Sequence, residues 1–118
     1  MGTFSHPITL VSPVEDRSET LAALVDTGAT FTSVPAQVLI QLGVPPQRTV
    51  RLRLASGEVV QQDIGEVQAE MNGERATIIC TFGPDDAPVL IGAHTLEAFL
   101  LTVDPVEQRL APVDALWL

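Results

Sequence analysis

The sequence predicts an all-β fold for this chain of 118 residues, organised as a single domain over residues 1–118 with one or two short helices. Three observations favour this class. Short aliphatic and β-branched runs alternate with breaks that contain Pro or Gly. One break is Asn72-Gly73, the strongest short-range signal of a β-hairpin. Hydrophobic residues make up 46% of the chain and aromatic residues only 4%, so the expected core is aliphatic.

The first third of the chain is expected to supply three extended segments. Residues 8–11 read as a strand that ends at Ser12-Pro13. The apolar run 21–25 is typical of a strand buried on both faces. Residues 30–34 are rich in β-branched side chains and predict another short extended segment.

A short helix is expected directly afterwards. Pro35 fits its first turn, because proline suits the start of a helix. Ala36, Leu39 and Ile40 follow at helical spacing. Gly43 is the expected stop, since glycine is favoured just beyond a helix.

Two hairpins are predicted in the middle of the chain. Residues 50–54 alternate apolar side chains with arginines, as in a half-exposed strand, and a turn at 55–58 leads into the return strand. Asn72-Gly73 then predicts a type I′ turn between strands at 67–71 and 76–80.

The last third is expected to hold a loop, a helix and a strand. Residues 83–88 predict the loop, and the apolar run 89–91 ends at Gly92. Thr95 is a candidate cap for a helix over 96–101, and residues 109–113 predict the final strand.

Composition excludes several classes of function. Six basic against fifteen acidic residues give a net charge of −9, which argues against binding to nucleic acid or to an anionic membrane. No apolar run approaches a membrane span, and the N-terminal segment lacks the features of a signal peptide. A single cysteine, Cys80, excludes an intramolecular disulfide and a thiolate zinc site. We therefore expect a cytoplasmic protein that needs neither a metal nor a cofactor.

The residues most suggestive of chemistry are 24–29, Leu-Val-Asp-Thr-Gly-Ala. Here an apolar strand delivers the Asp26 carboxylate into a turn that Gly28 permits. An Asp-Thr-Gly tripeptide alone is weak evidence, because an ordinary turn can follow a strand. The second apolar run, which ends in Ile91-Gly92 before a predicted helix, strengthens the signal.

Together with the hairpin between them, these two elements resemble the retropepsin-like aspartic proteases, which include retroviral proteases and bacterial relatives. The family motif is two apolar residues, Asp, Thr or Ser, Gly and Ala, followed by a flap hairpin and then by two apolar residues and Gly before a helix. The resemblance covers residues 21–113, nearly the whole chain, and implies a retropepsin-like acid protease barrel with a flap. Residues 54–59 and 92–112 look like small bacterial members.

The resemblance implies a role for each matching residue. Asp26 would be the catalytic carboxylate, Thr27 would hydrogen-bond between subunits, and Gly28 would contact substrate through its backbone. Ala29 stands where pepsin-like enzymes usually have Ser, which predicts a less acidic working pH than pepsin's. The flap tip would be Ala55, Ser56 and Gly57, and the second loop would be Ile91 and Gly92.

The single motif predicts a homodimer. Peptide hydrolysis without a metal or covalent nucleophile needs an acid and a base, and two carboxylates supply both. The chain has one Asp-Thr-Gly and no internal repeat, so the second Asp26 must come from another copy. The expected substrate is an extended peptide bound as an added strand. An aliphatic lining from Val25, Val34, Ile64 and Ile91 would favour apolar residues at the cleavage site.

Two departures from the retroviral pattern affect the dimer. Thr30 and Ala93 stand where retroviral enzymes usually carry an Asp and an Arg that pair. The apolar C-terminal residues 116–118 are therefore expected in a dimer sheet, with packing on the chain's own core as the alternative.

The alternative function is a non-catalytic peptide-binding or regulatory module, and a small β-barrel scaffold is a third reading. His6 and His94 lack metal-ligand spacing, and His94 is expected to be structural. Cys80 is expected to be a small residue of the core or of a strand face.

Overall fold

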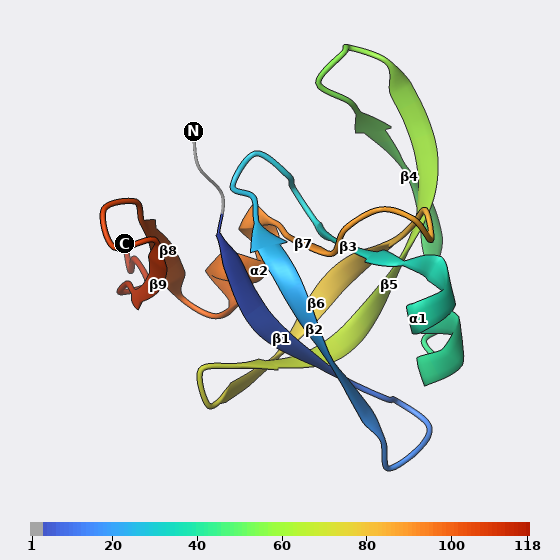
Figure 1. Cartoon of the computed structure of the whole chain (residues 1–118), viewed down its shortest axis with the longest axis horizontal. Helices are drawn as coiled ribbons and strands as arrows, with labels where there is room; N and C mark the ends of the chain where they lie inside the picture. The colour runs from blue at the N-terminus through green and yellow to red at the C-terminus, as the bar shows by residue number, and fades with distance from the viewer. Residues whose placement is uncertain (1–3) are drawn as a thin grey trace.

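The computed structural model describes residues 4–118, which form nine strands and two short helices (Figure 1). This mostly β architecture with two helices confirms the predicted fold class. The elements, in chain order, are β1 Ser5–Val11, β2 Ser18–Val25, β3 Thr32–Pro35, α1 Ala36–Leu42, β4 Arg48–Arg53, β5 Val59–Met71, β6 Glu74–Gly83, β7 Leu90–Ile91, α2 Ala93–Ala98, β8 Leu101–Asp104 and β9 Arg109–Pro112.

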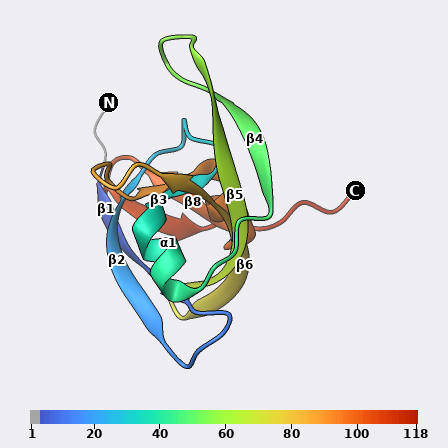
Figure 2. The same ribbon diagram turned by 90° about the vertical axis from the view of Figure 1, so that its right-hand side faces the viewer.

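Seven strands form one sheet in the order β1-β2-β7-β3-β6-β5-β4. Because β1 also pairs with β5, through Thr9↔Glu70 to Val11↔Gln68, six of these strands close into a barrel. β4 remains outside the closed ring, as an edge strand on β5. A separate hairpin of β8 and β9 follows, and the C-terminal tail extends away from the body in Figure 2.

The barrel encloses an aliphatic core, as the composition predicts. Fully buried side chains come from both early and late strands, for example Ile8, Leu10, Val34, Ile78 and Ile91, each at most 1% exposed. The helix α1 packs against this core through Leu39 and Leu42.

The second predicted hairpin is confirmed in its turn type. Asn72 and Gly73 have φ values of 53° and 80°, as a type I′ turn requires, and Met71 pairs with Glu74 across it. Gly43 ends α1 with a φ of 83°, so the predicted stop is also confirmed.

One burial prediction was wrong. β2 is not buried on both faces, because Ala23 and Val25 are buried whereas Ala22 is exposed and Leu24 half-buried. Only one face of this strand meets the barrel core. In α1, the buried residues are Leu39 and Leu42, whereas Ile40 is 58% exposed.

The second helix begins earlier than predicted. It covers Ala93–Ala98 and follows Gly92 directly, so Thr95 lies inside the helix and does not cap it. Of the residues predicted as its last turn, Phe99 and Leu100 form a turn, and Leu101 begins β8, a strand that was not predicted. Neither helix in the described part of the chain is long and apolar enough to cross a membrane.

Candidate active site

The loop that follows β2 holds the Asp26 side chain in place. Asp26 is half-buried, and one of its carboxylate oxygens, Oδ1, accepts a hydrogen bond of 2.9 Å from the backbone amide of Gly28. The Asp26 carbonyl accepts a second bond, of 3.2 Å, from the Ala29 amide. A Cβ on Gly28 would lie 3.3 Å from Oδ1, so a small residue suits this close approach.

A second loop, residues 91–94, is joined to the Asp26 loop by three backbone hydrogen bonds. The Asp26 amide donates to the Ile91 carbonyl at 2.9 Å. In the other direction, the Ala93 amide donates to Ala29 at 2.7 Å and the His94 amide donates to Thr30 at 2.9 Å. The two segments that the sequence analysis singled out, 26–29 and 91–92, are therefore directly joined.

Gly92 is required at this junction because backbone atoms approach it closely. A Cβ at this position would lie 2.4 Å from the Phe31 carbonyl oxygen and 2.9 Å from the Ala29 carbonyl oxygen. Its φ of −92° is ordinary, so steric space rather than backbone conformation demands glycine.

Two buried threonines, which the sequence analysis did not identify as a pair, fasten β3 to α2. Thr32 and Thr95 are both 0% exposed, and their hydroxyl oxygens are 2.6 Å apart. The Thr32 hydroxyl also accepts a bond of 3.1 Å from the Gly92 amide. Nothing in their spacing along the chain signals this contact, because it joins positions 63 residues apart.

The predicted flap residues lie at the tip of the β4–β5 hairpin. Ala55, Ser56 and Gly57 are all exposed, and Gly57 has a φ of 93°. Leu54 closes the turn. Its amide donates a hydrogen bond of 2.7 Å to the Glu58 carbonyl, and its carbonyl accepts one of 2.9 Å from the Gly57 amide. In Figure 1 and Figure 2 this tip and the loop after β2 lie on the same side of the barrel.

A cavity of about 660 Å³ lies between the Asp26 loop and the flap strands. Asp26 itself is not among its lining residues, which are Gly28, Ala29, Thr30, Phe31, Ser33, Arg51, Leu52, Arg53, Leu54, Val60, Gln62, Thr81, Gly83, Pro84 and Leu90. The four aliphatic residues predicted to line the substrate site do not line this cavity. Val25, Val34, Ile64 and Ile91 are all at most 4% exposed, because they belong to the barrel core.

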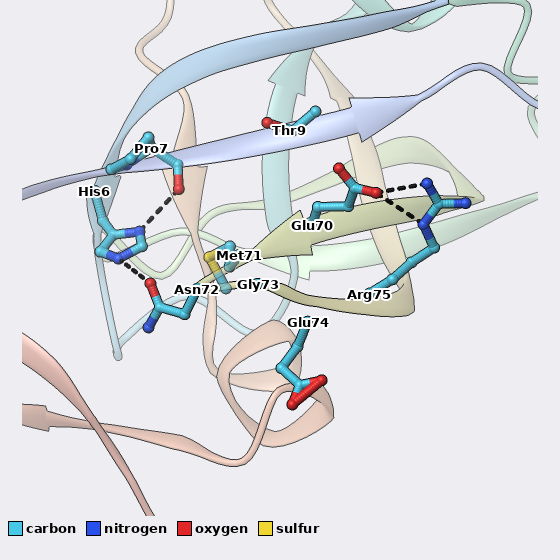
Figure 3. Close-up of a pocket in the computed structure, with 9 residues that line it drawn as sticks. All are labelled: His6, Pro7, Thr9, Glu70, Met71, Asn72, Gly73, Glu74 and Arg75. Carbon is cyan, nitrogen blue, oxygen red and sulfur yellow. Dashed lines mark hydrogen bonds and ion pairs between the residues drawn. The ribbon is translucent and has the colours of Figure 1, made fainter. Parts of the chain in front are cut away.

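Of two further depressions, one adjoins the Asp26 loop and the other lies elsewhere on the barrel. One, of about 210 Å³, is next to the Asp26 loop and is lined by Thr27, Thr30, His94 and Glu97 among others. The other, of about 420 Å³, lies between β1 and the β5–β6 turn (Figure 3). There the His6 ring contacts the Asn72 side-chain oxygen at 3.0 Å, and Arg75 pairs with Glu70. His94 is exposed on α2, 6.1 Å from the Phe31 ring.

The remaining candidates have no catalytic geometry. Cys80 is 0% exposed, and burial raises the pKa of its thiol to about 12. The thiolate required of a nucleophile is therefore strongly disfavoured. Within residues 4–118 no group of three or more His, Cys, Asp or Glu side chains could hold a metal ion.

Comparison with known proteins connects this geometry to a family. The family model described as "gag-polyprotein putative aspartyl protease" matches residues 14–98. A search of curated proteins gave no significant match.

Solved structures match over most of the chain. The simian foamy virus (mac) protease is 21% identical, with a TM-score of 0.57, over 80% of this chain and 92% of that one. The EIAV protease complexed with the inhibitor HBY-793 is 16% identical, with a TM-score of 0.58, over 83% and 88%. The retroviral protease-like domain of Ddi1 from Leishmania major is 18% identical, with a TM-score of 0.58, over 95% and 89%. The predicted retropepsin-like fold is thereby confirmed.

Proposed function

The chain belongs to the retropepsin-like aspartyl protease family, and from this premise we propose that it is an aspartic endopeptidase that is active as a symmetric homodimer. The observation that carries the proposal is the arrangement around Asp26. Its carboxylate follows a barrel strand, accepts a backbone hydrogen bond and stands on a loop fixed to the Ile91-Gly92 loop. Each chain supplies one such carboxylate.

Two copies would complete the chemistry. The Asp26 carboxylate of one copy would accept a proton from the water as its oxygen bonds to the peptide carbonyl carbon. The Asp26 carboxylic acid of the other copy would donate its proton to the leaving nitrogen as the C–N bond breaks. Thr27 is exposed beside Asp26, which suits the contact between subunits that the family resemblance implies. The β4–β5 hairpin would close over the peptide and exclude bulk water.

The substrate would be an extended peptide. β4 is an edge strand, so its outer backbone groups are available to pair with an added strand. Phe31, Leu52, Val60 and Leu90 give the cavity an apolar portion that suits an apolar side chain at the cleavage site. A cytoplasmic location is proposed on composition alone, since the chain has a single cysteine.

The test is cleavage of an unfolded protein or a peptide library by the wild type and by Asp26→Asn, with the oligomeric state measured by sedimentation. We expect a dimeric, active wild type and a dimeric, inactive variant. Mixing wild type with a large excess of the variant should also suppress activity, because mixed dimers lack one carboxylate. A dimeric wild type that binds peptides without cleaving them would instead support the non-catalytic binding module.

A further inference from the structure

The arginines of this chain divide into two groups. Three are paired with carboxylates: Arg17 with Glu15 at 3.2 Å, Arg75 with Glu70 at 2.5 Å, and Arg109 with Asp104 at 3.4 Å. The other three, Arg48, Arg51 and Arg53, have no carboxylate within ion-pair distance in residues 4–118. All three lie on the single strand β4.

Two of these unpaired arginines line the 660 Å³ cavity. Arg51 and Arg53 are exposed and stand on the strand face opposite that of Leu52, at the rim of the cavity. Arg53 also donates a hydrogen bond of 3.1 Å to the Gly57 carbonyl, which holds its guanidinium near the flap tip.

Among residues 4–118, none of those lining this cavity is acidic. The strand partners of Arg51 and Arg53 are Gln61 and Val59, which are uncharged. Two acidic residues lie close along the hairpin. Glu58 directly precedes Val59, and Asp63 pairs with Thr49 and accepts that side chain's hydroxyl at 2.7 Å. Within residues 4–118, neither forms an ion pair with Arg51 or Arg53. The rim is thus a local cationic site on a chain of net charge −9.

We propose that Arg51 and Arg53 make this groove selective for extended peptides that carry acidic side chains next to an apolar residue. The preference rests on the proposed function, because it names the substrate class of the same site. Residues two apart in a strand are spaced by roughly 6.6 Å, which is the spacing of alternate side chains in an extended peptide. Arginine also binds carboxylates through paired hydrogen bonds.

Protection of an exposed edge is the competing explanation, since charged residues on edge strands prevent aggregation. Charges of either sign serve that purpose, and basic side chains are the more common choice. The chain has fifteen acidic and six basic residues, yet β4 carries arginines and no acidic residue. Edge protection does not require that two of these arginines line the groove, and this placement favours an acidic ligand.

The experiment measures binding of labelled peptides to the full-length Asp26→Asn variant by fluorescence anisotropy. The peptides share one apolar core and differ only in flanking Glu, Gln or Lys residues. We expect the Glu-flanked peptide to bind about fivefold more tightly than the Gln-flanked peptide. Adding Arg51→Gln and Arg53→Gln should abolish the difference. Adding Arg75→Gln, which removes one positive charge away from the groove, should leave it unchanged.

Cleavage of the same peptides by chains that retain Asp26 separates this inference from the proposed function. If the Glu-flanked peptide binds more tightly but no chain cleaves any peptide, the acidic preference is supported and the proposed peptidase activity is contradicted. Cleavage with equal kcat/KM for the Glu-, Gln- and Lys-flanked peptides would overturn the acidic preference and leave the peptidase standing. The proposed role of Arg51 and Arg53 would also be overturned if the preference for the Glu-flanked peptide persisted in the variant that carries both substitutions. Aggregation of that variant with an unchanged ratio of Glu-flanked to Gln-flanked peptide binding would overturn it as well.

Discussion

Two glycines at the candidate site are needed for different physical reasons. Gly28 lets its backbone amide reach the Asp26 carboxylate, and a Cβ at this position would lie 3.3 Å from the carboxylate oxygen. Gly92 has no room for a Cβ, because the Phe31 and Ala29 carbonyls of the Asp26 loop press against it. Gly92 has no side chain that could take part in catalysis, yet it determines how closely the two loops approach.

Replacing Gly92 by Ala should separate the two loops. The new Cβ would meet backbone atoms at 2.4 and 2.5 Å, so we expect a loss of roughly 1–3 kcal/mol in the free energy of unfolding, together with loss of peptidase activity. Urea unfolding and peptide cleavage measure the two effects. Gly73→Ala is the matched control, because Gly73 has a positive φ but no atom within 4 Å of a Cβ. It should lose about 1 kcal/mol and keep activity.

Cys80 should dominate the alkaline stability of the protein. All six Lys and Arg residues are arginines and there is no tyrosine, so no other side chain titrates between pH 9 and 11. The pKa of the buried thiol is about 12, raised from 9.0 by desolvation. Above pH 9 the unfolded chain loses this proton while the folded chain keeps it, so stability falls as pH rises toward 12.

The expected loss between pH 9 and pH 10.5 is about 2 kcal/mol in the free energy of unfolding. Urea unfolding at the two pH values measures it. Cys80→Ala should be less stable at pH 9 because it leaves a cavity, but its stability should barely change between the two pH values. An equal alkaline loss in this variant would show that another process is responsible.

At the scale of elements, the Thr32–Thr95 pair joins a strand to a helix where the sheet offers no backbone pairing. Thr32→Val should leave the Thr95 hydroxyl and the Gly92 amide buried without this partner, at a cost of roughly 1–3 kcal/mol. Thr32→Ser keeps the hydroxyl and should lose less. Adding Thr95→Val to Thr32→Val should cost less than the two single changes together, because it removes one of the unsatisfied groups. Additive losses in urea unfolding would argue against a coupled pair.

The elements that local signals define were predictable from the sequence. Asn72-Gly73 requires positive φ at both positions and Gly43 ends a helix in the left-handed region, so both boundaries lie in the local chemistry. The second helix was placed three residues late because Thr95 suggested a cap, whereas its hydroxyl is engaged by Thr32 from another element. The pattern of residues 21–25 also could not show that one face of β2 would be exposed.

The site was predictable to the same extent. Residues 26–29 and 91–92 carry the family motifs, and the structure joins them by hydrogen bonds. The cavity lining was not predictable, because apolar residues such as Val25 and Ile91 belong equally well to a barrel core or to a groove. Closure of the barrel by β1 and β5 decides between these, and that pairing is a contact between distant segments.

At the scale of the whole molecule, the single copy has an unpartnered apolar end. Leu116, Trp117 and Leu118 are each at least 93% exposed, and Figure 2 shows the tail leaving the body. Placement of this tail in an interface between two copies would bury it. The proposed function requires that association of two copies also places two Asp26 carboxylates in one site. Opposing this association, each copy carries a net charge of −9. Salt should therefore strengthen the dimer, since screening reduces repulsion between like charges.

Trp117 is the only tryptophan, so its fluorescence reports directly on the tail. We expect its emission maximum to shift to shorter wavelength as protein concentration rises, at the same concentrations at which sedimentation detects dimers. The midpoint should move to lower concentration when salt is raised from about 0.05 to 0.5 M, because the screening length shortens. Leu116→Ser with Leu118→Ser should weaken the dimer. Val106→Ser, at an 84% exposed apolar position in the β8–β9 turn, should not. Dimers that form while Trp117 emission stays that of an exposed indole would place the interface elsewhere and leave the tail without this role.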